Sequence, residues 1–542
     1  MENVWMMYKS FDKDDWALDT LDALEDSGFG VIKRGKNEVE YFRNRSGLYD
    51  STDSTYVKKW LLGAGSQGLD PDQHRVLRRK LIPMGGRSLE NVMDNLPTYN
   101  PQSNPLPVLK DTKDQIIIPF RNGVVVITAD EISLKKYSEV VSDGNGVWKD
   151  KVIDRDIEIR PSEIKDGGFK APLAFQCEGI YSDFVRKVMI RDGDSESVSY
   201  VKSLRAVESC LGYLMHGYNN PAVSKFIYLT DWSVSDGNSP NGGNGKSLIF
   251  QSLMYLKDRV PKSPNGKGAF SFIDGKTWQS EGSASRFNIT SSAVNEKTDV
   301  FFIDDAPDDW DAKAIFTHVT GDFTTESKGQ TAIVIPSEVK PKIVVSSNYP
   351  PVGSGNSYER RRMILHAGNY FKTKQQEGIE EPIVDEYGKL LYDEFDDKDW
   401  SDFYNYCFLC GQRYLKYGLK PQPLDRLKTE MGHKSVSIQV GTNVAQWLSN
   451  HLKTQKSRFE EVPGYSQDDL YNDYKKDFPN DSEMTPTELH KHLRSIVEES
   501  DDYEYNPHRA HKGDTFQKRR YLVKVLQEDG KKKGVPHIVI GY

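Results

Sequence analysis

The chain has 542 residues, of which 37% are hydrophobic and 28% are charged, and its formal net charge is −8. This composition indicates a globular protein of several domains, and it excludes binding to nucleic acid through overall positive charge, so that any such contact must come from local basic patches. No apolar run approaches the roughly 20 residues of a membrane span. The first residues, MENVWMMYKSFDKDDW, lack a basic segment followed by an apolar one, so we expect neither a membrane segment nor a secretory signal.

The cysteines indicate a reducing compartment. There are four, Cys177, Cys210, Cys407 and Cys410, which are too few for a disulfide framework, and we therefore expect a cytoplasmic protein. Cys407 and Cys410 form a CxxC within FYNYCFLCGQRYL, an aromatic segment that is expected to be helical. Because no second pair accompanies them, packing is a better interpretation than a metal site.

Residues 1–100 are expected to form a small mixed α/β domain. The run WALDTLDALEDSG predicts a helix that ends at a glycine, VEYFRNRSGLYDS predicts two strands around a turn, and TYVKKWLLGAG predicts another helix. The segment YNPQSNPLP is typical of a linker. No pair of acidic residues on a strand with a nearby histidine indicates a polymerising or primase site here.

Residues 108–215 are expected to form a hairpin and helical collar before the next domain. In QIIIPFRNGVVVITADEI, two apolar runs flank Arg121-Asn122-Gly123 and predict a hairpin. The later run SYVKSLRAVESCLGYLMHG predicts an amphipathic helix. It leads into FIYLT, a predicted buried strand at the start of residues 216–420.

The stretch DWSVSDGNSPNGGNGKSLIF lies between that strand and a predicted helix, LIFQSLMYL. Strand, glycine-rich loop, Lys-Ser and helix is the order of a phosphate-binding P-loop. Lys246 is expected to reach the β- and γ-phosphates of ATP, and the Ser247 hydroxyl to ligate Mg²⁺. The strict pattern has glycine where this chain has Pro240, so a Gly/Asn-rich surface turn is the alternative. The expected nucleotide-binding residues are Gly242, Gly243, Asn244, Gly245, Lys246, Ser247 and Leu248.

Two later strands end in polar side chains. In DVFFIDDAPDDWD, a buried strand ends in Asp304 and Asp305. This arrangement predicts that Asp304 holds Mg²⁺ and that Asp305 polarises the attacking water, whereas the alternative is a solvated acidic turn. The strand IVVSSN ends in Asn348, whose amide can bond both the γ-phosphate and that water.

Three arginines, Arg360 to Arg362, follow in YERRRMIL. An arginine at this place can reach across a subunit interface to the γ-phosphate that a neighbour binds. We therefore name Arg360 and Arg361 as candidate catalytic residues. The alternative is a solvated basic turn.

Together these elements resemble the superfamily 3 helicases of the AAA+ class, and most of all the poxvirus-type primase-helicase branch that phages, large DNA viruses and mobile elements carry. The matching motifs are Gly245-Lys246-Ser247, Asp304-Asp305, Thr320-Gly321-Asp322 and Asn348, within a resemblance that spans roughly residues 110–420. The resemblance implies an ATP-dependent DNA helicase that acts in replication as a ring, expected to be a hexamer, on single-stranded DNA. A primase or polymerase is a candidate partner, and the bacterial cytoplasm is the expected location if a phage encodes the chain.

The resemblance also implies a β-hairpin that points into the channel of the ring. The segment TTESKGQTAIVIP matches it, and Lys328 at its tip is expected to contact DNA phosphates without reading sequence. The alternative is an ordinary exposed lysine, in which case Lys340 or Lys342 is the next candidate.

Residues 436–542 are expected to form a winged-helix-like domain that binds duplex DNA. VAQWLSNHLK, QDDLYNDYKKDFP and TPTELHKHLRSIVEES predict three helices, the last with Thr485 as its N-cap and Glu488 three residues later. YEYNPH and RRYLVKVL predict strands on either side of HRAHKGDTFQK, as a hairpin with a basic tip. Its expected DNA-binding residues are Lys512, Arg519 and Arg520.

The predicted fold class is therefore α/β, with an AAA+ P-loop core, a small mixed α/β N-terminal region and a winged-helix-like C-terminal domain. Two other functions stay open. One is a replication initiator that binds and melts an origin without processive unwinding. The other is a P-loop ATPase that acts on protein, which the basic C-terminal region disfavours.

Overall fold

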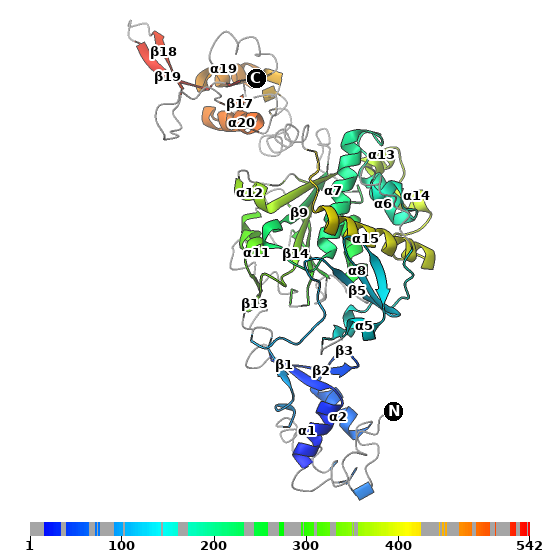
Figure 1. The fold of residues 1–542 in the computed structure, drawn as a ribbon. Helices are drawn as coiled ribbons and strands as arrows, with labels where there is room; N and C mark the ends of the chain where they lie inside the picture. Colours follow the sequence, from blue (N-terminus) through cyan, green and yellow to red (C-terminus); the bar gives the residue numbers. More distant parts are fainter. Residues whose placement is uncertain are drawn as a thin grey trace.

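The computed structural model contains an N-terminal unit, a central body and a C-terminal unit, in that order along the chain (Figure 1). It describes residues 16–33, 39–63, 92–100, 103–141, 145–160, 172–231, 243–257, 270–275, 297–307, 312–325, 332–349, 356–423, 465–479, 484–498, 521–526, 532–538 and 540–541, together with shorter pieces between them. Within these ranges, no helix has both the length and the apolar character that a bilayer crossing needs.

The N-terminal unit contains a five-stranded sheet, in the strand order β4-β1-β2-β3-β8, and the helices α1 and α2. The predicted helices and the predicted strand pair are confirmed, and Arg45 opposite Leu48 closes the β2–β3 hairpin. Strand β8 comes from beyond residue 100, a pairing that the sequence did not predict. The elements are α1 (Trp16–Asp26), β1 (Phe29–Lys33), β2 (Val39–Arg45), β3 (Leu48–Thr52), α2 (Ser54–Leu62), β4 (Thr98–Tyr99) and β8 (Val147–Trp148).

A three-stranded antiparallel sheet and three helices precede the core. The predicted hairpin is confirmed, because Phe120 pairs with Gly123 across a two-residue loop of Arg121 and Asn122. The predicted amphipathic helix is α7, whose first turn is capped by the Ser197 side chain. The elements are β5 (Ile116–Phe120), β6 (Gly123–Ile127), β7 (Ile132–Lys135), α5 (Tyr137–Val140), α6 (Ile180–Val188) and α7 (Val198–Met215).

The core is a five-stranded sheet, and all of its strands run parallel, in the order β10-β11-β14-β9-β15. Alternate side chains along each strand point to opposite faces, and both faces are covered. On β9, Phe226 and Tyr228 pack on one face, and Ile227 and Leu229 pack on the other. The strands are β9 (Phe226–Asp231), β10 (Phe270–Asp274), β11 (Val300–Ala306), β14 (Lys342–Ser347) and β15 (Arg362–Ala367).

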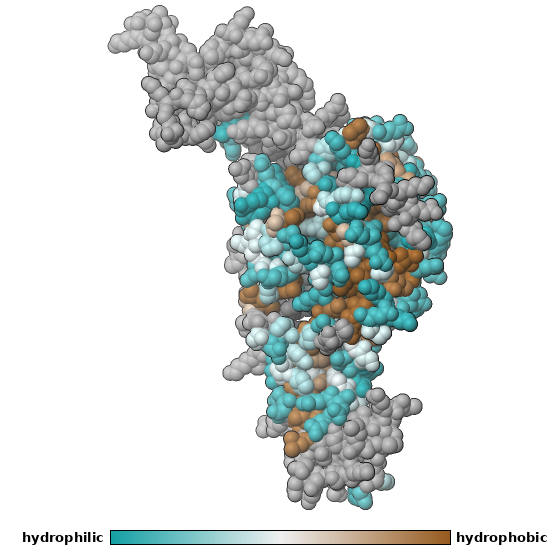
Figure 2. Space-filling model, viewed as in Figure 1, coloured by the Kyte–Doolittle hydropathy of each residue, from teal (hydrophilic) through white to brown (hydrophobic). Residues whose placement is uncertain are grey.

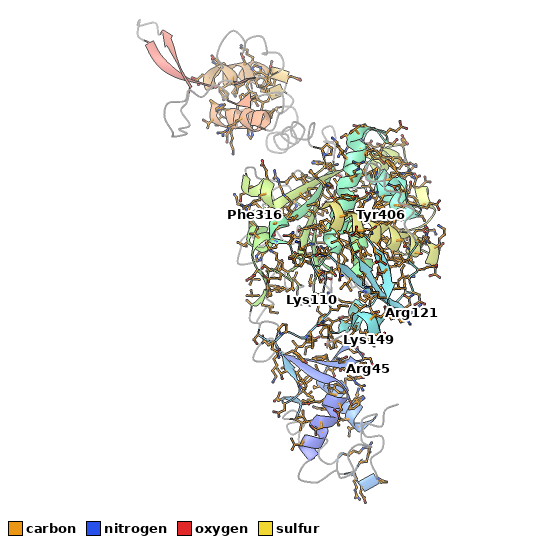
Figure 3. The ribbon with its side chains drawn as sticks, viewed as in Figure 1. Arg45, Lys110, Arg121, Lys149, Phe316 and Tyr406 are labelled. Carbon is orange, nitrogen blue, oxygen red and sulfur yellow. The ribbon has the colours of Figure 1, made fainter. Side chains whose placement is uncertain are left out.

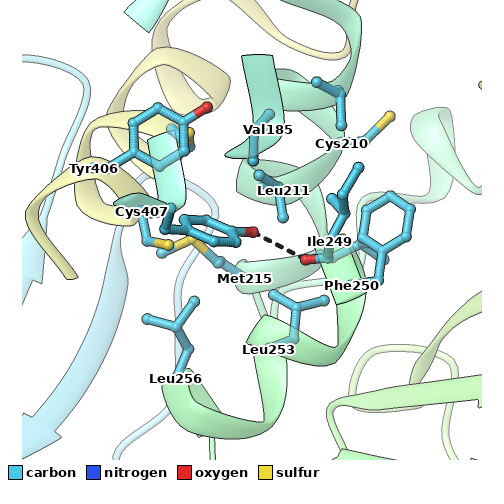
Figure 4. Close-up of a cluster of buried hydrophobic side chains, with 14 of the residues drawn as sticks. Val185, Cys210, Leu211, Met215, Ile249, Phe250, Leu253, Leu256, Tyr406 and Cys407 are labelled. Atoms are coloured by element: carbon cyan, nitrogen blue, oxygen red, sulfur yellow. Dashed lines mark hydrogen bonds between the residues drawn. The ribbon is translucent and has the colours of Figure 1, made fainter. Parts of the chain in front are cut away.

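Helices α7, α8 (Lys246–Lys257) and α15 (Asp397–Tyr417) cover one face of the sheet. Figure 4 shows buried side chains from these three helices and from α6. The Tyr181 hydroxyl of α6 donates to the Ile249 carbonyl of α8 at 2.9 Å. Cys407 lies among them, and it is fully buried with Cys410 in α15, in agreement with the packing interpretation. Because this layer is well packed, α8 is held firmly behind the loop that precedes it.

The other face carries shorter elements. A hairpin of β12 (Phe323–Thr325) and β13 (Ile333–Ile335) forms where the channel hairpin was predicted, and its tip lies outside the described residues. Figure 2 shows hydrophilic side chains over much of one side of the central body, with hydrophobic ones between them. Helices α11 (Phe316–Thr320) and α12 (Asn356–Arg361) also pack on this face, whereas α13 (Tyr370–Gln376) and α14 (Pro382–Tyr387) pack against the layer on the first face.

The C-terminal unit contains the predicted helices α19 (Gln467–Asp477) and α20 (Pro486–Glu498). Thr485 and Glu488 form the predicted capping box, since the Thr485 amide donates to Glu488 Oε2 at 3.1 Å and the Glu488 amide donates to Thr485 Oγ1 at 3.3 Å. A three-stranded sheet joins these helices in the order β16-β19-β18, with β16 at Tyr465–Ser466, β18 at Tyr521–Leu526 and β19 at Lys532–Ile538.

The predicted C-terminal hairpin is wrong in its pairing. Strand β18 pairs with β19, and β17 (Glu504–Tyr505) pairs with β20 (Ile540–Gly541) instead of with β18. The connection from β18 to β19 is much shorter than the one from β17 to β18, so closing it costs less chain entropy. The basic segment between β17 and β18 is therefore not the tip of a hairpin formed by those two strands.

Candidate functional site

Polar side chains gather at the carboxyl edge of the core sheet. β9 ends at Asp231, β11 carries Asp304 and Asp305 at its end, and Asn348 directly follows β14. Because β14 lies between β11 and β9 and all three are parallel, these ends meet at one edge. Figure 1 shows β9 and β14 at the centre of the central body, beside α7 and α8.

Lys246, the first residue of α8, is held between two of these strand ends. Its ammonium lies 3.1 Å from Asp231 Oδ1 and 3.2 Å from Asp231 Oδ2, and it donates a short hydrogen bond to Asn348 Oδ1. The Lys246 side chain is 8% exposed and that of Asp231 is 4% exposed. The lysine is thus a buried cation with two side-chain partners.

Three oxygen atoms lie together beside the lysine. The Ser247 hydroxyl donates to Asp304 Oδ1 at 2.6 Å, and the Ser346 hydroxyl donates to the same oxygen. The two hydroxyl oxygens are 3.3 Å apart. Hydroxyl and carboxylate oxygens are the ligands that Mg²⁺ prefers, and Ser247 and Asp304 are the pair that the sequence predicted for it. Ser346 was not predicted.

Asp305 is turned out of the strand by a local irregularity. The register between β11 and β14 shifts between Ile303 and Ala306, and Asp305 has a positive φ of 53°. The Asp305 amide donates to Ser346 Oγ at 3.2 Å, and Asp305 Oδ1 accepts from Asn348 Nδ2 at 3.2 Å. A left-handed aspartate at a bulge is an uncommon conformation of the kind that concentrates at functional sites. The structure therefore brings Asp305 and Asn348 together.

The loop before α8 depends on its glycines. Gly243 and Gly245 have φ values of 113° and 74°, which side chains other than glycine seldom adopt. A Cβ on Gly245 would also lie 3.0 Å from the Phe184 ring. Asn244 is buried, and its Nδ2 donates to Asp231 Oδ1 at 2.8 Å.

Leu248, which was predicted as part of the nucleotide-binding loop, lies within a helix. Leu248 is partly buried within α8, and its carbonyl accepts from the Tyr392 hydroxyl at 2.7 Å, so it anchors the helix. Gly242 lies outside the described residues.

The candidate arginines have different surroundings. Arg361 Nη1 donates to the Ser357 hydroxyl at 2.6 Å and to the Ser357 carbonyl at 3.1 Å, and its guanidinium lies over the Phe316 ring. Figure 3 marks Phe316 at the side of the central body. Arg360 is exposed, and among the described residues its guanidinium makes no hydrogen bond or ion pair. Of the two, only Arg360 has a head group that is available to another molecule.

The two alternative channel lysines are buried. Lys340 donates to the carbonyls of Val319 and Gly321, both at 2.7 Å, and its burial lowers its pKa to about 8. Lys342 donates to the Tyr213 carbonyl at 2.6 Å and also to the His216 carbonyl. Neither lysine can reach DNA, so the prediction that one of them is the next candidate is wrong. The predicted DNA-binding residues Lys328, Lys512, Arg519 and Arg520 lie outside the described residues.

Asp231, like Ser346, is a site residue that sequence reasoning missed. The sequence held a clue, because Asp231 directly follows the buried run FIYLT, just as Asp304 directly follows another buried run. An aspartate at the carboxyl end of a central parallel strand faces the same edge as the phosphate loop.

Comparisons with known proteins add little to this geometry. No protein-family model matches the chain. No curated protein matches it either. Among solved structures, the chain is similar to the apo A form of the NrS-1 C-terminal region, with a TM-score of 0.30 and 11% sequence identity, over 79% of this chain and 96% of that one. A likeness at this level carries no argument about function.

Proposed function

We propose that this chain is an ATP-dependent DNA helicase of superfamily 3 that acts in DNA replication, for example of a phage or mobile element. The observation that carries the proposal is the convergence of Lys246, Ser247, Asp304, Asp305 and Asn348 at one edge of the core sheet. These residues lie far apart in the sequence, and the strand order brings them into a chain of contacts.

The residues present fit a magnesium nucleotide. The Ser247 and Asp304 oxygens are hard ligands suited to Mg²⁺. The glycines with positive φ carry no side chains, so a ligand can approach the loop backbone at the N-terminus of α8. Backbone amides and the helix dipole favour phosphate binding there. When bound, Mg·ATP supplies the scissile phosphoanhydride bond and the metal that neutralises charge on its oxygens.

Each side chain then has a separable role. Lys246 holds phosphate oxygens as a point charge, and Ser247 with Asp304 holds the metal. The Asp305 carboxylate orients the attacking water, and the hydrogen bond from Asn348 Nδ2 fixes its Oδ1 at 3.2 Å. Asn348 bonds both Lys246 and Asp305, so it couples phosphate binding to water positioning.

Assembly into a ring, which we propose to be a hexamer, would complete the site. Arg360 lies in the last turn of the short helix α12 and is exposed, as a residue that acts on a neighbouring subunit's nucleotide must be. Lys225 Nζ donates to the carbonyls of Glu359, Arg360 and Arg362, at 3.1, 3.0 and 3.3 Å, and this fixes the backbone that presents Arg360.

Two regions are proposed to contact DNA. Lys328 falls in the sequence between β12 and β13, and this hairpin is proposed to grip single strands through phosphate contacts of that lysine. The C-terminal unit is proposed to be a winged-helix-like domain that binds duplex DNA, and its helices α19 and α20 with a three-stranded antiparallel sheet support this proposal.

A strand-displacement assay tests this function. The purified chain is given Mg·ATP and a forked DNA with a long duplex arm, and displacement of the strand is followed over time. We expect displacement that requires hydrolysable ATP. Melting of a short duplex without displacement of the long arm would favour the origin-melting initiator, and an ATPase that DNA does not stimulate would favour neither.

A further inference from the structure

The Asp231 carboxylate contacts the Lys246 ammonium, which is the group that nucleotide phosphates are proposed to bind. Its two carboxylate oxygens lie 3.1 and 3.2 Å from the Lys246 ammonium. The pair is almost fully enclosed, so solvent screens it little and the attraction is strong. Nothing in the P-loop pattern requires a carboxylate here.

The carboxylate is also fixed in place by the loop itself. Asn244 Nδ2 donates to Asp231 Oδ1, which links the strand end directly to the glycine-rich loop. The three side chains of Asp231, Asn244 and Lys246 thus close on one another. Asp304 and Asp305 add two more carboxylates nearby, and the Lys246 ammonium pairs with Asp231 within this group.

We propose that Asp231 is a counter-ion latch, which neutralises Lys246 in the nucleotide-free protein and must release it when phosphate binds. The inference rests on the proposed nucleotide site and adds a regulatory contact to it. Phosphate oxygens compete with Asp231 for the same ammonium, and the carboxylate repels them at short range. Asp231 therefore sets the nucleotide affinity below the value that the loop alone would give.

A purely supporting role for Asp231 leads to the opposite expectation. If the carboxylate only held Lys246 in the position that phosphate needs, then a neutral residue would loosen the lysine and weaken nucleotide binding. The direction of the change in affinity therefore separates the two roles. General damage to the site would also weaken nucleotide binding. A gain in affinity therefore cannot be explained by such damage or by the loss of a supporting role.

The test is calorimetric titration of the full chain with Mg·ADP and Mg·ATP, for the wild type and Asp231→Asn. Asparagine keeps the size and a hydrogen-bonding oxygen but removes the charge. We expect the Kd for both nucleotides to fall at least about tenfold, which corresponds to about 1.4 kcal/mol. We also expect a lower thermal midpoint without nucleotide, because Lys246 loses its buried partner.

Asp402→Asn is the matched control. Asp402 is also a buried aspartate, and it pairs with two cations, Arg160 and Lys398, away from the phosphate loop. Its variant should lower thermal stability and leave the nucleotide Kd unchanged. Equal tightening in both variants would overturn the latch, because the effect would then not depend on contact with Lys246.

The remaining outcomes are also decisive. A Kd that is unchanged or higher in Asp231→Asn overturns the latch while nucleotide binding by the wild type stands. No saturable binding by the wild type overturns the proposed function itself. If Asp231→Asn does not fold, Asp231→Thr gives the same neutral test with a residue that suits a strand end.

Discussion

The two ends of the core sheet use buried lysines in different ways. At the carboxyl end, Lys246 bonds the side chains of Asp231 and Asn348. At the amino end, Lys342 starts β14 and bonds the backbone carbonyls of Tyr213 and His216. Side-chain partners can turn away to admit a ligand, whereas carbonyls at the end of α7 cannot move without unravelling the helix. The first lysine is therefore suited to binding, and the second to stability.

The charged residues around each end of the sheet show the same difference between stability and binding. Near the amino end, Lys151 pairs with Asp299 at 3.1 Å, and Lys297 pairs with Glu40 of β2 at 2.9 Å and lies over the Trp148 ring. These contacts join the core to the N-terminal sheet, near Lys110 and Lys149 in Figure 3. Near the carboxyl end, the partners of Lys246 are side chains of the candidate site, namely the predicted Asn348 and the unpredicted Asp231.

The largest effect is expected at the carboxyl end. Lys246→Ala should reduce ATP hydrolysis by at least about a hundredfold, because Lys246 is the cation that these strand ends hold where the phosphates are proposed to bind. The fold should persist, since α8 remains packed on the sheet. Phosphate release and circular dichroism measure the two quantities, and wild-type turnover in a folded variant would contradict the assignment.

Arg360 should show the next largest effect. Arg360→Ala is expected to bind ATP normally and to hydrolyse it about a hundredfold more slowly, whereas the matched variant Arg361→Ala should stay close to wild type, because Ser357 and Phe316 hold that guanidinium.

Mixing identifies the subunit that supplies the arginine. Mixtures of Arg360→Ala and Lys246→Ala proteins should regain hydrolysis at interfaces where one subunit supplies the loop and the other the arginine. If both variants assemble and no mixing ratio restores turnover, the arginine does not act in trans.

At the amino end, the expected effect is on stability. Lys342→Met should lower the free energy of unfolding by about 2–4 kcal/mol, because two buried carbonyls lose their donor. Lys149→Met is the control, since Lys149 is about half exposed and pairs with Asp50 at 3.0 Å, so its loss should cost less than about 1 kcal/mol. Equal midpoints of urea unfolding for the two variants would remove the contrast between the ends of the sheet.

The smallest effect is expected from His318, on the pH dependence of stability. His318 directly precedes Val319, whose carbonyl accepts from Lys340. Burial lowers its pKa from 6.5 to about 4, and its Nδ1 accepts from the Thr324 amide at 3.4 Å. The unfolded chain therefore binds the extra proton between pH 4 and 6.5, so this contribution to stability is present above pH 6.5 and is lost as the pH falls toward 4.

Replacement of the histidine tests that sign. From pH 7 to pH 5, the wild type should lose about 2 kcal/mol more than His318→Gln, as measured by urea unfolding at each pH. Parallel pH profiles for the two proteins would show that His318 does not titrate in this way.

The sequence predicted most of the core elements and most of the site. FIYLT, VFFI and IVVSSN are apolar runs that end in a polar residue or are followed by one. Such a run predicts both a buried strand and the polar side chains at the end of that strand. Strand order does not follow from such runs, and that order places Asn348 between Lys246 and Asp305. Asp231 and Ser346 were missed because their roles arise from contacts between strands.

The roles of the lysines and of the C-terminal strands needed the structure for the same reason. Lys340 and Lys342 have the sequence surroundings of exposed residues, yet distant carbonyls bury and bond them. The strand β18 was placed correctly, but its partner was not, because pairing depends on loop length and on the strand that follows.

The most direct test of the nucleotide site is equilibrium binding of ATP to the wild type and to Lys246→Ala. Each protein is titrated in the presence and in the absence of Mg²⁺. Our account predicts saturable binding of one nucleotide per chain in the wild type, weaker binding without Mg²⁺ because Ser247 and Asp304 lose their metal, and little binding in the variant. Binding that is unchanged by loss of Lys246 and of Mg²⁺ would contradict the account.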